Sequence, residues 1–246
     1  MKIQRIDINV DVGEGVGNES LLMPYVSSCN IACGGHAGNN KTMRKVVKLA
    51  KQYRVKIGAH PSFPDIENFG RKLMDMPCVT LFTSLKEQIS DLMAIISEEN
   101  TMLHHVKPHG ALYHMAATDT KIATTIIEVM KSIALPVKLY VPYKSVIEIL
   151  AIQNNIPITY EAFADRNYND DLTLVTRNDS NAIIHDSNAM LEHVFHIIDK
   201  QKVKTITGAD IPIKAETFCV HGDNLHAAEL LKNLRSNLEA RGVKIL

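Results

Sequence analysis

The segment from Ile6 to Val12 alternates apolar and polar side chains at every step. Apolar residues occupy positions 6, 8, 10 and 12, and the positions between them hold Asp7, Asn9 and Asp11. A β-strand sends successive side chains to opposite faces, so this strand has one apolar face and one face with two carboxylates and an amide. An exposed edge strand would also produce the pattern. Polar residues recur at the ends of later strands, however, and this favours a strand whose polar face carries a function.

Short β-branched runs alternate with longer helical patterns along the chain. The runs predicted as strands lie at residues 3–10, 27–33, 55–59, 103–107, 137–141, 158–161 and 217–221. The predicted helices lie at residues 41–53, 80–99, from 118 or 119 to 133, and from 223 or 224 to 242. Such alternation is typical of βαβ units and a parallel sheet. The segment 167–212 fits it poorly, and we expect a helix at 189–200 and a strand pair around residues 174 and 211–213.

The polar strand faces favour a closed barrel over an open sheet. Strands of an open doubly wound sheet are normally apolar on both faces. A small barrel instead has a lumen, and polar side chains can gather there near the carboxyl ends of the strands. The chain has 246 residues and no internal repeat or Gly/Ser linker. We therefore predict one α/β domain, residues 1–246, that forms a (β/α) barrel with about seven parallel strands.

Charge and composition exclude several classes of function. Lys plus Arg and Asp plus Glu number 27 each, and this balance argues against a broad binding surface for nucleic acid or an anionic membrane. The N-terminus lacks the apolar run of a signal peptide, and no stretch approaches the ~18 apolar residues of a membrane span. The four cysteines show no disulfide or metal-site spacing. We therefore expect a cytoplasmic protein with free thiols.

Polar residues follow the carboxyl ends of most predicted strands, where the functional groups of parallel α/β folds gather. Four strands end in, or are followed within six residues by, a histidine: His36, His60, His109 and His221. The other polar residues at these ends are Asp11, Glu14, Asn30, Lys107, Asp165, Arg166 and Asp223. Each residue alone has an ordinary structural explanation, such as a helix cap for Asp223. Their convergence on one rim favours an active site there.

Six motifs in sequence order resemble those of the LamB/YcsF family, which includes one of the subunits, the A component, of the bacterial ATP-dependent 5-oxoprolinase. They are DINVDVGEGVG (7–17), SSCNIACGGHAG (27–38), IGAHPSFPDIENFGR (57–71), HVKPHGALY (105–113), EAFADRNY (161–168) and VHGD (220–223). The resemblance implies a fold similar to the seven-stranded (β/α) barrels of glycoside hydrolases and polysaccharide deacetylases. Gly35 departs from the bulky aromatic that is usual in the family, and Asn39 from the usual aspartate. Either departure could alter a pocket wall, but neither removes a histidine or a carboxylate.

The resemblance also implies a reaction. In it, 5-oxo-L-proline, ATP and water give L-glutamate, ADP and phosphate, with Mg²⁺ accompanying ATP and with the B and C subunits of 5-oxoprolinase as partners. Phosphorylation of the amide oxygen would make the lactam a better electrophile for water. Asn18 breaks the GxGxxG fingerprint and the chain has no GxxxxGK[ST] motif, so a standard P-loop does not hold the nucleotide.

The implied roles divide the candidate residues by chemical type. Candidates for water activation or Mg²⁺ coordination are Asp11, Glu14 and Asp165. Candidates for binding the substrate carboxylate or phosphate are Lys107, Arg71 and Arg166. Further substrate contacts are expected from Asn30 and Asp223. Candidate acid/base groups or metal ligands are His36, His60, His109 and His221.

Two other functions remain open at this point. An ATP-independent metal hydrolase, such as a carbohydrate deacetylase, would hold Zn²⁺ or a similar ion on Asp11, His36 and His60, with one position left for water. A noncatalytic subunit would bind the lactam and pass it to its partners. For a catalytic subunit, we expect alanine at His109 or Lys107 to abolish activity and to leave the fold intact.

Overall fold

The computed structural model describes residues 4–222 and 226–246. Its strands are β1 (Arg5–Val12), β2 (Ser28–Ala32), β3 (Lys56–His60), β4 (Leu103–Val106), β5 (Lys138–Pro142), β6 (Ile158–Phe163), β7 (Lys202–Lys204), β8 (Asp210–Pro212), β9 (Thr217–Val220) and β10 (Lys244–Ile245). Its helices are α1 (Glu19–Leu22), the 3₁₀ turn η1 (Met23–Tyr25), α2 (Asn40–Tyr53), α3 (Cys78–Glu98), α4 (Gly110–Thr118), α5 (Thr120–Lys131), α6 (Val146–Gln153), α7 (Ser187–Lys200) and α8 (Ala227–Ala240).

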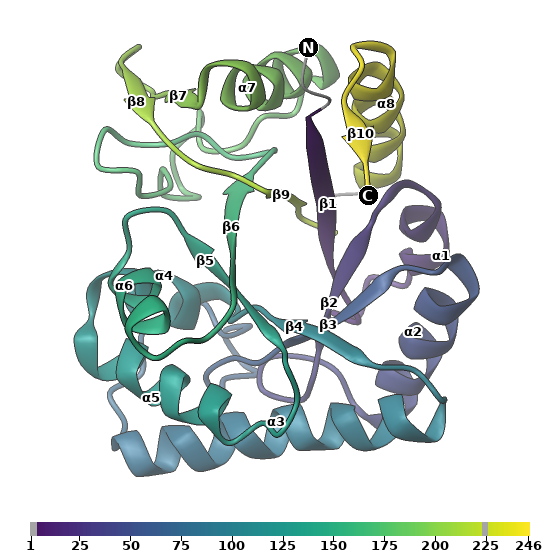
Figure 1. The fold of residues 1–246 in the computed structure, drawn as a ribbon, viewed down its shortest axis with the longest axis vertical. Coiled ribbons are helices and arrows are strands. Elements are labelled where there is room, and N and C mark those ends of the chain that lie inside the picture. The colour runs from purple at the N-terminus through teal and green to yellow at the C-terminus, as the bar shows by residue number, and fades with distance from the viewer. Residues whose placement is uncertain (1–3, 223–225) are drawn as a thin grey trace.

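Strands of the described chain close into a parallel barrel, which confirms the predicted fold (Figure 1). The order around the ring is β1, β2, β3, β4, β5, β6 and β9, and β9 pairs again with β1. The short strand β10 lies against the amino end of β1, where Arg5 pairs with Lys244. The helices lie around the outside of this ring. The carboxyl ends of all barrel strands therefore meet at one mouth.

The alternation in β1 separates the lumen of the barrel from the helical shell. Asp7, Asn9 and Asp11 are all buried, and their side chains form hydrogen bonds with groups on other strands. Asp7 accepts hydrogen bonds from Ser28 Oγ at 2.5 Å and from Thr217 Oγ1 at 2.7 Å. An exposed edge strand would leave these polar groups in water. The polar face of β1 instead lines a lumen in which polar side chains pair with one another.

Most predicted elements are present, with bounds that differ by one or two residues. Helix α5 starts at Thr120 because Asp119 caps it, accepting a hydrogen bond from the Ile122 amide at 2.9 Å. Helix α7 starts at Ser187, two residues before its predicted start, because Asp186 caps it in the same way. The predicted starts of the first strand at residue 3 and of the last helix at residue 223 or 224 lie outside the described residues.

Several short elements escaped the sequence prediction. These are α1, η1, α4, α6 and β10. Helices α1, α4 and α6 are at most nine residues long, too short to show a helical period clearly. Among the described residues, no helix has the length and hydropathy needed to cross a membrane.

The predicted strand pair in segment 167–212 is wrong in its partners. Strand β8 pairs antiparallel with β7, with Val203 opposite Ile211. Leu174 instead forms an isolated bridge with Tyr168. Gln201 ends α7 with a left-handed φ of 52°, and the chain turns there into β7. Residues 210–212 therefore pair with β7, the strand directly after that helix.

Candidate active site at the barrel mouth

Lys107 lies between acidic groups in the upper lumen. Its Nζ is 3.0 Å from Asp11 Oδ1, 3.0 Å from Glu161 Oε1 and 3.0 Å from Cys219 Sγ. We call these four residues the lysine cluster. Burial opposes the ammonium charge of Lys107, but attraction to Asp11 outweighs it and raises the pKa of Lys107 well above its ordinary value. The Lys107 ammonium is thus charged, and two neighbouring carboxylates already balance that charge. This environment differs from that of a lysine whose charge is left for a phosphate group to balance.

A buried amide beneath this cluster fixes the position of Asp11. Asn30 Nδ2 donates to Asp11 Oδ1 at 2.7 Å, and Asn30 Oδ1 accepts from His105 Nε2 at 2.7 Å. The His105 ring stacks on Tyr140 at a centroid distance of 4.0 Å. Asn30 therefore contacts Asp11 and His105 inside the lumen. One oxygen of Asp11, Oδ1, therefore accepts from both the Asn30 amide and the Lys107 ammonium.

Glycine at position 58 makes room for His105. A Cβ at Gly58 would lie 2.1 Å from His105 Nε2. His105 is not among the site candidates predicted from the sequence, and the structure buries it in the lumen. Its position two residues before Lys107 is the signal that could have placed it there, because residues two apart on a strand share a face.

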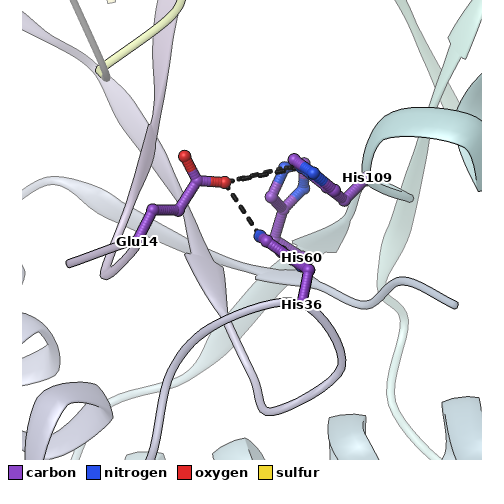
Figure 2. Close-up of side chains that lie close together, drawn as sticks. All are labelled: Glu14, His36, His60 and His109. Atoms are coloured by element: carbon purple, nitrogen blue, oxygen red, sulfur yellow. Dashed lines mark hydrogen bonds and ion pairs between the residues drawn. The ribbon is translucent and has the colours of Figure 1, made fainter. Parts of the chain in front are cut away.

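Four side chains from four strand ends meet at the mouth of the barrel (Figure 2). Glu14 follows β1, His36 follows β2, His60 ends β3 and His109 follows β4. Glu14 Oε1 lies 2.9 Å from His36 Nε2, 3.4 Å from His109 Nδ1 and 3.9 Å from His60 Nε2. We call these residues the imidazole–carboxylate cluster. Asp11, expected as a ligand beside His36 and His60, has its Oδ2 3.5 Å from His60 Nε2, so Glu14 is the carboxylate that all three rings share.

Burial keeps two of these rings neutral. His36 and His109 stack at a centroid distance of 3.6 Å with an angle of 4° between their planes. Burial lowers the pKa of His36, although Glu14 opposes the shift. Burial, followed by repulsion from His60 and His36, also lowers the pKa of His109. Neutral imidazoles of this kind can accept a proton or coordinate a metal ion.

The loop after β3 encloses one side of the imidazole–carboxylate cluster. Phe69 presents its ring to His36 and His109 at centroid distances of 5.0 and 5.4 Å. Phe69 has a left-handed φ of 56°, and its carbonyl accepts a hydrogen bond from His109 Nε2 at 2.9 Å. Next to it, a Cβ on Gly70 would come within 3.0 Å of His36 Cβ. The loop therefore fits closely over the rings and screens them from water.

His221 and Asp165 form a second acid–base pair at the mouth. The backbone amide of His221 donates to Asp165 Oδ2 at 2.9 Å, and His221 Nδ1 lies 3.0 Å from both carboxylate oxygens. Burial favours protonation of Asp165, but the attraction of His221 outweighs it and lowers the pKa of Asp165. This arrangement fixes the ring through Nδ1 and leaves Nε2 as the nitrogen available for proton transfer. Asp223, the last candidate from the sequence, lies outside the described residues.

Guanidinium groups gather beside this pair. Arg166 is buried and donates to the carbonyls of Val175 at 2.6 Å and Ala182 at 3.2 Å, so it holds the loop after β6. Burial, and then the nearby charge of Arg177, lowers the pKa of Arg166, and Arg71 contributes to the same shift. Arg71 itself packs over the Phe69 ring at 4.8 Å. Three guanidinium groups, those of Arg71, Arg166 and Arg177, therefore lie close enough together for their charges to interact.

Two groups outside the sequence-based site candidates, Tyr113 and Glu161, also lie at the mouth, although the sequence places Glu161 at the end of a predicted strand. The Tyr113 hydroxyl and Glu161 Oε2 are buried without a hydrogen-bond partner in the described part of the chain. Burial, and then the charge of Glu161, raises the pKa of Tyr113 well above its ordinary value, so the two groups are neighbours. A separate cavity of about 740 Å³ lies between α7 and the preceding loop, lined by residues such as His185, His193 and Lys204. The acid–base groups that the sequence predicted converge instead at the mouth of the barrel.

Comparisons with known proteins agree with this architecture. The sequence profile of the LamB/YcsF family matches residues 6–246. The chain belongs to the LamB/YcsF family. Two proteins of Haemophilus influenzae, from strains PittGG and PittEE, are named as the A component of 5-oxoprolinase. Each is 40% identical to this chain over 243 residues, which is 99% of both chains.

Solved structures place this family member among known barrels. A lactam utilization protein from Thermus thermophilus has a TM-score of 0.92 and 33% identity, with 98% of this chain and 99% of that chain covered. A putative cellobiose-phosphate cleavage protein from Enterococcus faecalis V583 has a TM-score of 0.63 at 10% identity, covering 100% of this chain and 97% of that chain. The second likeness concerns the fold alone.

The two departures from the LamB/YcsF pattern have local explanations. A Cβ at Gly35 would lie 2.3 Å from Ser62 Oγ and 2.5 Å from Gln88 Oε1. The Gln88 side chain fills this space from α3. Its Oε1 accepts a hydrogen bond from the Ser62 amide at 3.0 Å, and its Nε2 donates to the Ser62 carbonyl at 2.9 Å. Asn39 caps α2, its Oδ1 accepting from the Thr42 amide at 3.0 Å. An aspartate would make the same cap, so this departure leaves the mouth unchanged.

Proposed function

We propose that this chain is the lactam-hydrolysing subunit of an ATP-dependent 5-oxoprolinase that works with two partners, the B and C subunits. The observation that carries the proposal is the 40% identity to a protein named as the A component of 5-oxoprolinase, over 99% of both chains. The reaction converts 5-oxo-L-proline, ATP and water into L-glutamate, ADP and phosphate. The acid–base groups at the barrel mouth are of the kind that such a reaction needs.

The chemistry must overcome the stability of a cyclic amide. Transfer of the γ-phosphoryl group to the amide oxygen forms a new O–P bond and releases ADP. Water then adds to the activated carbon, and the ring nitrogen leaves with a proton to give an acyl phosphate. A second water hydrolyses this acyl phosphate to the carboxylate and phosphate. The protein must therefore bind an anion, accept a proton from water and deliver one to nitrogen.

We assign these tasks to the groups that the mouth brings together. The Glu14 carboxylate with its neutral imidazoles accepts the proton of water. His221, held by Asp165, delivers a proton to the leaving nitrogen through Nε2. The guanidinium groups around Arg166 attract the carboxylate or phosphate anion. We give Lys107 a positioning role. Asp11 and Glu161 already balance the lysine charge, so the ion pair with Lys107 holds Asp11 in place.

The lactam amide offers one N–H donor and one carbonyl acceptor. Glu161 Oε2 and the Tyr113 hydroxyl are a complementary acceptor and donor, and the two groups are buried beside each other. We therefore assign the amide to the space beside them. Tyr113→Phe removes only the hydroxyl, and we expect it to raise KM for 5-oxoproline about tenfold, the effect of one lost hydrogen bond.

The test is glutamate release from 5-oxoproline with ATP and Mg²⁺. The chain is assayed alone, and then together with the proposed B and C partner subunits. We expect glutamate only with ATP and the partners, and a loss of at least about 100-fold in the His109→Gln complex. His196→Gln is the matched control, because it removes a histidine–aspartate pair from the exposed surface of α7. An assembled complex that releases no glutamate would contradict the proposal.

A second candidate is an ATP-independent, metal-dependent amide hydrolase. The observation that favours it is the convergence of three imidazoles and a carboxylate at the mouth. It predicts hydrolysis by the chain alone, without ATP and with sensitivity to chelators. A noncatalytic lactam-binding subunit would instead give a complex whose turnover is indifferent to His109→Gln. The cytoplasmic location stays a prediction under each alternative.

A further inference from the structure

The tautomers of His60 and His109 can be read from their outer contacts. His60 Nδ1 lies 2.7 Å from the carbonyl oxygen of Lys107, and His109 Nε2 lies 2.9 Å from the carbonyl oxygen of Phe69. A carbonyl oxygen only accepts hydrogen bonds, so each of these nitrogens carries a proton. In neutral rings the opposite nitrogens, His60 Nε2 and His109 Nδ1, then carry lone pairs.

Those two lone pairs face each other. His60 Nε2 and His109 Nδ1 are 2.9 Å apart, which is hydrogen-bond distance without a hydrogen to share. Glu14 Oε1 adds a negative oxygen 3.4 Å from His109 Nδ1, and His36 Nε2 lies 2.9 Å from the same oxygen. The electron-rich atoms therefore converge on one place. A cation between them turns this repulsion into attraction.

The number of converging atoms distinguishes a metal ion from a proton. A proton bridges only two atoms, whereas four ligand atoms, one each from Glu14, His36, His60 and His109, all lie within 4.8 Å of one another. Ligands at about 2.0–2.1 Å in a tetrahedral site are about 3.3–3.4 Å apart. The measured separations of 2.9, 3.4 and 3.9 Å bracket that value. Small side-chain shifts would complete such a site.

We propose that Glu14, His36, His60 and His109 bind one divalent transition-metal ion. Three imidazoles and one carboxylate favour Zn²⁺, Mn²⁺ or Fe²⁺ over Mg²⁺, which prefers oxygen ligands. The outer hydrogen bonds of His60 and His109 to backbone carbonyls are the usual way that a protein orients metal-binding rings. The Phe69 ring packs against both members of the stacked pair, at centroid distances of 5.0 Å from His36 and 5.4 Å from His109. This inference stands independently of ATP and of the lactam reaction.

The test measures metal binding by the full-length chain. Metal is removed with a chelator, Co²⁺ is titrated while its visible d–d absorption is recorded, and Zn²⁺ is then added as a competitor. We expect one Co²⁺ per chain, with the intense absorption of a four- or five-coordinate site, displaced by one equivalent of Zn²⁺. His109→Gln and Glu14→Gln should each weaken Co²⁺ binding at least about 100-fold, beyond the 10–100-fold of outer-shell changes.

The control variant is His196→Gln, whose imidazole pairs with Asp210 at 3.1 Å on the surface. It should bind Co²⁺ as tightly as the unchanged protein. Circular dichroism and thermal unfolding of each variant separate loss of metal from loss of fold. Two results would overturn the proposal. The first is a wild-type chain that takes up less than about a tenth of an equivalent of Co²⁺ and Zn²⁺, a result that counts even if every cluster variant unfolds. The second is unchanged Co²⁺ binding in a folded His109→Gln variant. In that case a proton shared between His60 and His109 explains their contact.

Discussion

Lys107 is held between Asp11 and Glu161, and its removal leaves both carboxylates buried without it. Breaking a buried ion pair typically costs about 3–5 kcal/mol. We therefore expect Lys107→Ala to lower the free energy of unfolding by about that amount, measured by urea denaturation near pH 7. This revises the expectation that alanine at this position leaves the fold intact. Loss of activity in this variant would accordingly reflect lost stability as well as lost chemistry.

An exposed lysine provides the comparison for this prediction. Lys131 pairs with Glu128 at 2.8 Å on the surface of α5. Surface pairs of this kind contribute about 0–1 kcal/mol, so Lys131→Ala should change stability little. Equal losses in Lys107→Ala and Lys131→Ala would show that the lysine cluster does not stabilise the fold.

His105 should make stability depend on pH in the mildly acidic range. Burial lowers its folded pKa well below the ordinary value, so the folded protein keeps the ring neutral while the unfolded chain protonates it below about pH 6.5. Unfolding is then favoured as pH falls, by up to about 1.4 kcal/mol per pH unit. We expect His105→Gln to reduce the slope of the unfolding free energy against pH by up to that amount between about pH 6.5 and pH 5. The unfolding free energy is measured with a chelator present, so that metal binding does not contribute to the slope. A parallel slope in the variant would contradict the neutral state.

The stability of helix α2 depends on the residue that caps its start, Asn39. Asn39 Oδ1 accepts a hydrogen bond from the Thr42 amide, one of the backbone donors that a helix leaves unpaired at its start. Asn39→Ala should lower the free energy of unfolding by about 1 kcal/mol, while Asn39→Asp should be neutral or slightly stabilising, because a negative charge suits this end of a helix. Thermal unfolding of the two variants side by side tests this. Equal losses in both would contradict the capping role.

The barrel and the β7–β8 pair should differ in local stability. Strand β1 is hydrogen-bonded on both flanks, to β2 and to β9, and lies in the buried centre of the molecule. Strands β7 and β8 pair only with each other in the described structure. Hydrogen exchange read by mass spectrometry should show β1 amides exchanging at least about 100-fold more slowly than those of β7 and β8, since local opening spans from almost zero to the global unfolding energy. Similar rates in the two regions would indicate that the hairpin is part of the cooperative core.

The sequence predicted the architecture better than the pairings. Alternation around Asp7 and Asn9 indicated a polar lumen, and histidines after successive strands indicated a mouth, because both follow from the period of a strand and the direction of parallel strands. Which carboxylate meets the imidazoles depends on loop conformation, and here Glu14 takes that position. Asn30, Gly58 and His105 are neighbours only through the register of β2, β3 and β4. No local pattern encodes that register.

The space opposite Gly35 has a consequence for how relatives of this protein diverge. Position 35 on the β2 loop and position 88 on α3 compete for one volume, since Gln88 Oε1 lies 2.5 Å from where a Cβ at 35 would be. A large side chain can occupy that volume from one side only. Positions 35 and 88 should therefore covary across the family, with large residues at 35 accompanied by small ones at 88. Introducing an aromatic at 35 into this chain would require a compensating reduction at 88, so the two positions evolve as a unit.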